Sequence, residues 1–290
     1  MEISDRIPSY THICHFCIML SGIVENAGQS IREFEKPIMD LLICLLNLKS
    51  QSIHPEALTT MTKMVKSIKS DIIPYFGPLF EIINFSLTSG NSNIIKKSAI
   101  LSYFILEADN SESISFSFET IKSLFDALYS NIMYVNHAID LDCKLELIAV
   151  FGKILRLVKV AAEPFFSSYG RILDSNSKMP LDLLRDEDVE VAKELFPVVV
   201  DGYADLFVAA LGTDFMEVYN NNFRGIVGLI VHITGEAEMC LDTRLKWSLL
   251  AFLEMVAGKM SHVGKKTVTL MHGDKVRNVV KRLKEDDDYD

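Results

Sequence analysis

The chain has 290 residues, of which 49% are hydrophobic and 23% charged, so it can bury a large core and differs from disordered proteins. Its formal net charge of -10 argues against a general nucleic-acid binder, because neutralising phosphates requires clustered Lys and Arg. The five cysteines lie mostly at apolar helix positions without a disulfide framework, which indicates a reducing compartment, cytosol or nucleus.

The first predicted element is a buried helix around the apolar run 13–24. This run is shorter than the roughly 18 to 20 residues that span a bilayer, and His15 interrupts it, so we expect no membrane insertion. It also contains a Cys-x-x-Cys pair, Cys14 and Cys17, next to His12 and His15. A structural zinc needs four ligands, and no second pair follows at a workable spacing. We therefore interpret both cysteines as helix-core residues and expect no metal.

Two patterns then alternate along the chain. One is a helical turn that recurs at offsets of 41, 45 and 45 residues, starting at Pro37, Pro78, Ser123 and Ser168. The other is an apolar residue, a basic one and helically spaced apolar residues, starting at Ile53, Ile95 and Cys143. Periods of about 40 to 47 residues with two helices each are typical of HEAT and armadillo repeats. The sequence therefore predicts an all-α fold, an α-α superhelix of the HEAT/armadillo-type solenoid class.

The apolar residues also locate individual helices. Second helices of each pair are predicted over 34–45 and 72–87, where apolar residues follow the i, i+4, i+7 rule. Beyond residue 181 the repeats are less regular, and the expected helices lie at about 189–211, 216–233, 242–260 and 274–284. Residues 285–290 are expected to form a disordered acidic tail. We predict one domain, a single array over 1–290 of about six to seven helix pairs.

Three stretches resemble the importin-β (karyopherin-β) family. Residues 144–154, KLELIAVFGKI, followed by 163–169, EPFFSSY, are similar to a carboxyl-terminal segment of that family in which a VFGDIAL helix precedes an F-x-x-Y-L helix. Residues 70–76, SDIIPYF, similarly resemble the family's SNI-[LI]-P-[YF] helix start. Two features depart from the pattern: the acidic loop of the middle repeats is absent, and Trp247 does not match the family's late tryptophan.

The resemblance implies that the chain corresponds to the carboxyl-terminal third of a nuclear import receptor, a protein that moves between cytoplasm and nucleus. It implies no enzymatic activity and no cofactor. The partners it implies are a protein with a basic helix, importin-α-like or cargo, and nucleoporins, with no nucleic acid. Because the family's amino-terminal repeats bind the GTPase Ran, we expect the Ran-binding half to be absent from this chain.

Aligning the recurring turns places Asp40, Glu81 and Asp126 at one position of successive second helices. Such helices usually line the concave face of this architecture, where stacked carboxylates would attract a Lys/Arg-rich helix. The alternative is a solvated helix face with no partner, and Arg171 at the fourth equivalent position interrupts the column. Weaker partner-binding candidates of the same kind are Glu33, Glu35, Glu119, Asp201 and Asp205.

Other motifs do not carry chemistry. The stretch 264–267, GKKT, lacks the first phosphate-loop glycine, because position 259 is Lys259. Residues 286–290 contain D-D-x-x-D, a magnesium-diphosphate motif, but they end the chain instead of lining a cavity. Two alternatives to the import receptor stay open: a HEAT scaffold subunit of a phosphatase or chromosome-associated complex and, more remotely, a helical diphosphate-using enzyme. The enzyme would require a second acidic motif, which is not visible.

Overall fold

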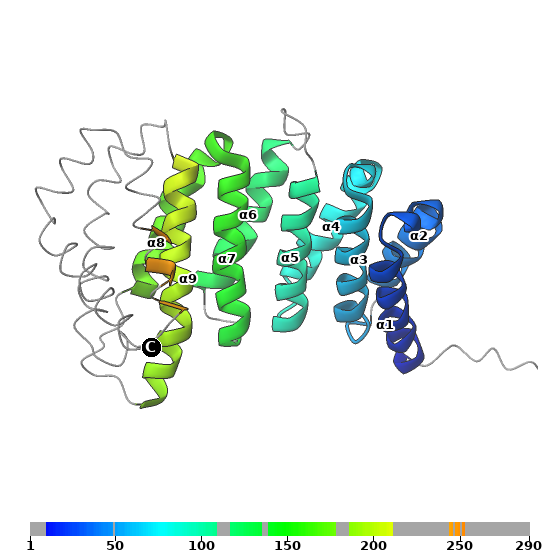
Figure 1. Cartoon of the computed structure of the whole chain (residues 1–290), viewed down its shortest axis with the longest axis horizontal. Coiled ribbons are helices and arrows are strands. Elements are labelled where there is room, and N and C mark those ends of the chain that lie inside the picture. The colour runs from blue at the N-terminus through cyan, green and yellow to red at the C-terminus, as the bar shows by residue number, and fades with distance from the viewer. Residues whose placement is uncertain are drawn as a thin grey trace, which may run out of the picture. The chain divides into compact units, whose positions relative to one another are not determined.

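The computed structural model describes residues 10–48, 50–108, 117–134, 139–177, 186–210, 244–245, 247–249 and 251–252. Within these ranges every regular element is a helix, which confirms the predicted all-α class (Figure 1). Among these same residues there is no helix with both the length and the apolar character that crossing a membrane requires. The helices predicted at 216–233 and 274–284, most of 242–260 and the tail 285–290 lie outside the described residues.

The chain divides into two compact units, residues 1–150 and 151–290, and each is described by itself. The helices of the first unit are α1 (Tyr10–Ala27), α2 (Glu35–Leu46), α3 (His54–Ile68), α4 (Phe76–Leu87), α5 (Ser92–Ala108), α6 (Phe118–Met133) and the first part of α7 (Leu141–Val158). The second unit contains the rest of α7, α8 (Glu163–Ser177) and α9 (Asp186–Ala210). Both predicted repeat patterns therefore fall on helices, and α9 matches the helix expected at 189–211.

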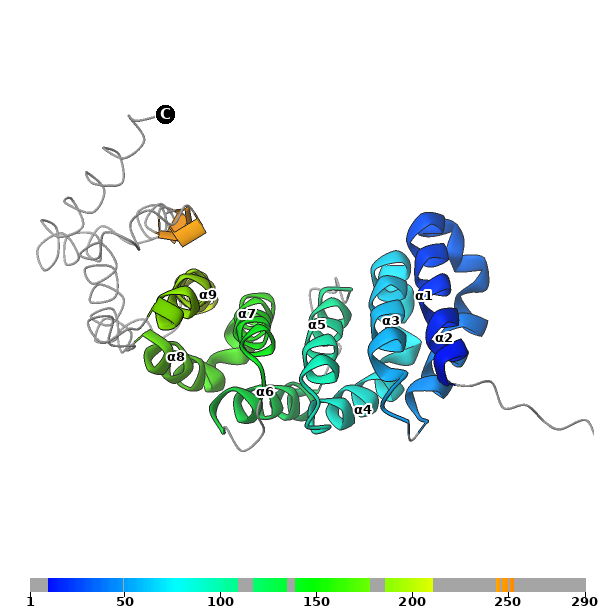
Figure 2. The same ribbon diagram turned by 90° about the horizontal axis from the view of Figure 1, so that it is seen from below.

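Helices of the first unit form two rows. Figure 2 shows α4 and α6 in one row and α3 and α5 in the other. In the second row α3 packs against both α1 and α5, while α4 packs against α5 and α6. The apolar stripe of α3 is fully buried, as the 0% exposure of Ala57, Met61 and Ile68 shows. Burial between neighbours on both sides, more than helix propensity, therefore stabilises these short helices.

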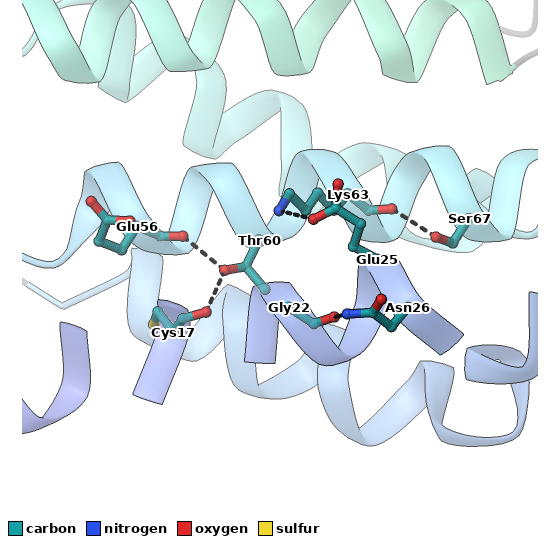
Figure 3. A network of polar contacts seen from close by, with 8 residues as sticks. All are labelled: Cys17, Gly22, Glu25, Asn26, Glu56, Thr60, Lys63 and Ser67. Carbon is teal, nitrogen blue, oxygen red and sulfur yellow. Dashed lines mark hydrogen bonds and ion pairs between the residues drawn. The ribbon is translucent and has the colours of Figure 1, made fainter. Parts of the chain in front are cut away.

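Polar side chains join consecutive helices of this second row. The ammonium of Lys63 on α3 lies 2.7 Å from the Glu25 carboxylate on α1, and Lys97 on α5 donates to the Thr59 hydroxyl on α3 at 2.7 Å. On α5, Lys96 donates to Asp142 on α7. The first two pairs lie at different positions of their repeats, so each joins its two helices independently, as Figure 3 shows for Lys63 and Glu25.

The turn between the helices of a pair also repeats. Among the described residues it is a 3₁₀ segment between α1 and α2, between α3 and α4, and between α7 and α8: η1 (Gly28–Phe34), η2 (Lys69–Tyr75) and η3 (Lys159–Ala162). The first residue of each has a positive φ: 52° at Gly28, 51° at Lys69 and 55° at Lys159. This conformation reverses the chain after the preceding helix, and only glycine adopts it without steric cost. At Lys69, where ψ is -122°, the backbone is therefore strained.

We expect Lys69→Gly to stabilise the protein by about 1 kcal/mol, since relief of backbone strain exceeds the entropic cost of a glycine. Urea unfolding monitored by circular dichroism would measure the change. The mirror substitution Gly28→Lys places a side chain at the same turn position of the preceding repeat, where φ is 52°, and should destabilise. A loss of stability in Lys69→Gly would contradict the strain argument.

Candidate partner-binding surface

The three carboxylates in repeat register lie on helices α2, α4 and α6. Asp40, Glu81 and Asp126 are all exposed, and each is preceded by a buried residue and followed two positions later by another. These flanking pairs are Met39 and Leu42, Phe80 and Ile83, and Phe125 and Leu128. Because α4 packs against both α2 and α6, the three carboxylates occupy equivalent outward positions on neighbouring helices. We call Asp40, Glu81 and Asp126 the acidic strip.

Two lysines reduce the charge of the acidic strip. Lys36 and Lys122 are exposed one turn before Asp40 and Asp126, whereas Gly77 occupies the equivalent position before Glu81. Within the described residues neither lysine forms an ion pair with its aspartate. Both are nevertheless close enough, at i and i+4, to weaken the field of the carboxylate. Glu81 is therefore the carboxylate of the acidic strip whose charge is least compensated on its own helix.

A phenol adjoins one end of the acidic strip. The Tyr75 hydroxyl lies close enough to Glu35 and Asp40 for the charges of both carboxylates to act on it. Desolvation is the largest cause that raises the pKa of Tyr75, followed by these two negative charges. Tyr75 thus stays a neutral hydrogen-bond donor beside two carboxylates. The sequence analysis did not connect these residues, although the resemblance at 70–76 includes Tyr75.

The weaker candidates do not form one cluster with the acidic strip. Glu33 is exposed in η1. Glu119 is exposed in the first turn of α6, where its negative charge interacts favourably with the helix dipole and needs no binding partner to explain it. Asp201 and Asp205 lie on α9, in the other unit. Asp201 is exposed. Arg171, at the fourth repeat position, is exposed on α8.

Asp205 differs from the expected surface carboxylate. Its side chain is only 16% exposed, and one oxygen lies 3.5 Å from the Arg156 guanidinium. Burial raises the pKa of Asp205 to about 6, and the positive charge of Arg156 opposes that rise. Its environment includes the buried Tyr169 ring, which stacks on Phe151 at 4.8 Å between centroids. Asp205 therefore contributes to the packing of its unit rather than to an open surface.

The cysteine pair of α1 lies against α3. Cys17 is 0% exposed, and burial raises the pKa of its thiol to about 11, so it is protonated at neutral pH. The Cys14 thiol lies 3.5 Å from the Ser52 carbonyl oxygen. Among the described residues, no three His, Cys, Asp or Glu side chains are grouped so that they could hold a metal ion. Cys17 is thus buried in the helix core, as predicted, whereas Cys14 is only partly buried.

A small cavity of about 250 Å³ lies where α3 and α5 end. It is lined by Val65, Lys66, Lys69, Phe104, Glu107 and Ala108. The Lys66 ammonium lies 3.9 Å above the centre of the Phe104 ring, a cation-π contact. Two ammonium groups and one carboxylate line this cavity, so its charge does not favour a basic ligand. A basic partner is therefore better matched by the acidic strip.

Comparison with known proteins identifies the repeat type. The family described as "Importin subunit beta-1-like, TPR repeats" matches residues 1–284. A solved structure titled "Crystal Structure of Importin Beta in a Polyethylene Glycol Condition" has a TM-score of 0.69 and 12% sequence identity, and the match covers 98% of this chain and 36% of that one. The search of curated proteins finds no match. The fold likeness confirms the predicted helical solenoid class, and the chain spans about a third of the importin β chain that it resembles. Since the family match extends over nearly its whole length, the chain belongs to the importin subunit beta-1-like family of helical-repeat proteins.

Proposed function

We propose that this protein is a non-catalytic nuclear transport receptor that binds a Lys/Arg-rich helix, from an importin-α-like adaptor or from cargo, along the acidic strip. The family match over 1–284 supports transport as the class of function. The observation that carries the proposal is the register of Asp40, Glu81 and Asp126, which are exposed at one position of three neighbouring helices. Such a receptor would act in both cytoplasm and nucleus, and nucleoporins would be further partners.

The spacing of the acidic strip suits an elongated basic ligand. One carboxylate per helix presents charges at intervals set by helix packing, about 8 to 10 Å, and basic residues between one and two turns apart on a helix, at about 5.4 Å per turn, can approach them. Tyr75 beside Asp40 adds a neutral hydrogen-bond donor at one end. Each exposed pair contributes little, about 0.2 to 1 kcal/mol, so we expect affinity to come from several contacts together and to fall with salt.

The test is titration of a fluorescent Lys/Arg-rich peptide at low and moderate salt. We expect saturable binding that weakens as salt rises. Glu81→Lys with Asp126→Lys should raise the Kd about 10- to 30-fold at low salt, because each change removes an attraction and adds a repulsion. Adding Asp40→Lys should weaken binding further.

The matched control is Glu107→Lys with Glu194→Lys, which makes the same change in net charge at two exposed acidic residues outside the acidic strip. We expect this control to bind almost as well as the wild type. Equal losses in the two variants would mean that net charge, and not the acidic strip, governs binding. Absence of binding to the wild-type protein would reject the transport proposal and favour a HEAT scaffold role.

A further inference from the structure

The cavity at the ends of α3 and α5 combines apolar walls with positive charge. Val65 and Ala108 are 1% and 7% exposed, and together with the Phe104 ring they form the apolar part of its lining. Lys66 and Lys69, both exposed, line the same cavity. Its volume of about 250 Å³ is far more than one water molecule needs. The cavity therefore has room for a group that is apolar at one end and charged at the other.

The carboxylates nearest these two lysines have other partners. Glu107 lines the cavity, and its carboxylate accepts a hydrogen bond from the Tyr103 hydroxyl at 2.7 Å. The Glu25 carboxylate, on which the charge of Lys66 acts, lies 2.7 Å from the Lys63 ammonium. Within the described part of the chain, neither carboxylate forms an ion pair with a lysine of the cavity.

The two ammonium groups of the cavity therefore keep their charge available. The Lys66 ammonium lies 3.9 Å above the centre of the Phe104 ring, a contact that orients a cation without neutralising it. Among the residues that the structure describes, the Lys69 ammonium has neither a hydrogen bond nor an ion pair. With Glu107 counted, the lining carries a single net positive charge, which favours an anion with one negative charge.

The backbone at Lys69 gives an independent sign of a binding role. Its φ of 51° and ψ of -122° are costly for a lysine, and the preceding repeat has Gly28 at this turn position. The Lys69 N–H donates to the Val65 carbonyl, and the Ile68 carbonyl accepts from the Arg32 guanidinium at 3.4 Å. The turn is thus held on both sides of a strained residue. Strain of this kind is concentrated at ligand sites, where the surrounding structure maintains it.

We propose that this cavity binds a carboxylate joined to an apolar group, either a Glu or Asp next to an apolar residue in a peptide or a small carboxylic acid. Lys66 and Lys69 hold the carboxylate, and Val65, Phe104 and Ala108 contact the apolar part. The single net positive charge of the lining favours a carboxylate over a doubly charged phosphate. The site shares no residue with the acidic strip, so it stands or fails independently of the transport proposal.

The test is a ligand-observed NMR titration of the whole chain with phenylacetate and with phenylacetamide, its neutral analogue of the same shape. We expect a Kd on the order of 1 mM for phenylacetate and about 10-fold weaker binding of the amide. A peptide Leu-Glu-Leu, acetylated and amidated so that the Glu side chain is its only charge, separates the two sources. Tighter binding of this peptide would identify a peptide segment as the ligand, and tighter binding of phenylacetate a small acid. Equal binding of phenylacetate and its amide would overturn the proposal, as would no binding of either carboxylate.

Lys69→Gly tests the site against its own structural cost. This variant should bind phenylacetate about 3- to 5-fold more weakly although its fold is at least as stable as the wild type, because it loses one ammonium and the backbone strain together. The matched control is Lys159→Gly, the same substitution at a turn residue with φ of 55° that does not line the cavity. This control should bind like the wild type. Lys66→Gln, which leaves the turn unchanged, should weaken binding by a similar factor. Wild-type affinity in Lys69→Gly, or equal losses in Lys69→Gly and Lys159→Gly, would refute the assignment.

Discussion

Gly152→Ala is expected to destabilise the protein by about 2 to 3 kcal/mol, a large effect for one methyl group. A Cβ at Gly152 on α7 would lie 2.5 Å from the Tyr169 hydroxyl oxygen and 3.0 Å from an Asp205 oxygen. Neither atom has free space to move into, because Tyr169 is 0% exposed and Asp205 is mostly buried. To relieve this steric clash, α7 would have to move away from α8, or the Tyr169 ring would have to lose its stacking on Phe151.

Gly202, on α9, is a second glycine that lies next to the Tyr169 hydroxyl group. A Cβ at Gly202 would lie 2.6 Å from the Tyr169 hydroxyl oxygen and 2.7 Å from a Leu173 methyl group. The Tyr169 side chain therefore ends between two helices that approach closely only because both positions are glycine. Gly202→Ala should destabilise at least as much as Gly152→Ala, since its Cβ meets two buried side chains.

Denaturant unfolding followed by circular dichroism would measure both losses. Gly170→Ala is the matched control, because Gly170 is also a buried helical glycine, yet its Cβ would lie at an ordinary 3.9 Å from Leu206. That control should be neutral or stabilise by up to about 1 kcal/mol through helix propensity. Equal effects at Gly152 and Gly170 would show that the close approach to Tyr169 is not the cause.

Tyr169→Phe provides a further check on the mechanism. Without the hydroxyl, the nearest atom to a Cβ at Gly152 is the Asp205 oxygen at 3.0 Å. Gly152→Ala should therefore cost less in the Tyr169→Phe protein than in the wild type, by about 1 kcal/mol or more in a double-mutant cycle. Gly202→Ala should be rescued less, because the 2.7 Å approach to Leu173 remains.

The helices were predictable because their apolar residues recur at helical spacing, which is a local property of the sequence. The turns between helices were less predictable, because a lysine at position 69 gives no sign of the positive φ that the folded chain adopts there. The helix around 13–24 was predicted to be buried, and α1 is buried only on its α3 side. Periodicity shows that a face is apolar, but not whether a neighbour covers it.

For the candidate surface, the repeat positions of the carboxylates could be predicted from the sequence, but the burial of each carboxylate could not. The outward positions of Asp40, Glu81 and Asp126 follow from repeat spacing alone. The burial of Asp205 could not be read in the same way, because it depends on side chains from α7 and α8 that meet only in the folded unit.

Asp205→Asn is expected to remove a pH dependence of stability worth about 2 to 3 kcal/mol. Desolvation by burial is the largest cause that raises the pKa of Asp205, from 3.8 to about 6. The nearby Asp201 raises it further, while Arg156 and Lys153 lower it. With 16% of the side chain exposed, solvent screens these interactions only partly.

The direction of this pH dependence follows from the difference in proton binding between the folded and the unfolded protein. The folded protein holds the Asp205 proton more tightly than the unfolded chain, so protonation favours the folded state. This contribution is fully present below the unfolded pKa of 3.8 and is lost as pH rises through the folded pKa of about 6. An asparagine does not titrate, so the stability of Asp205→Asn relative to wild type should increase by about 2 to 3 kcal/mol between pH 4 and pH 7.

Unfolding free energies of wild type and Asp205→Asn across that range would measure the difference, in which the titration of all other groups largely cancels. Arg156→Gln tests the cause, because loss of the guanidinium 3.5 Å from Asp205 removes a charge that lowers its pKa. The window of pH dependence should then move to higher pH. A difference between wild type and Asp205→Asn that stays constant from pH 4 to pH 7 would mean that Asp205 titrates alike in folded and unfolded chains, and that burial does not control its ionisation.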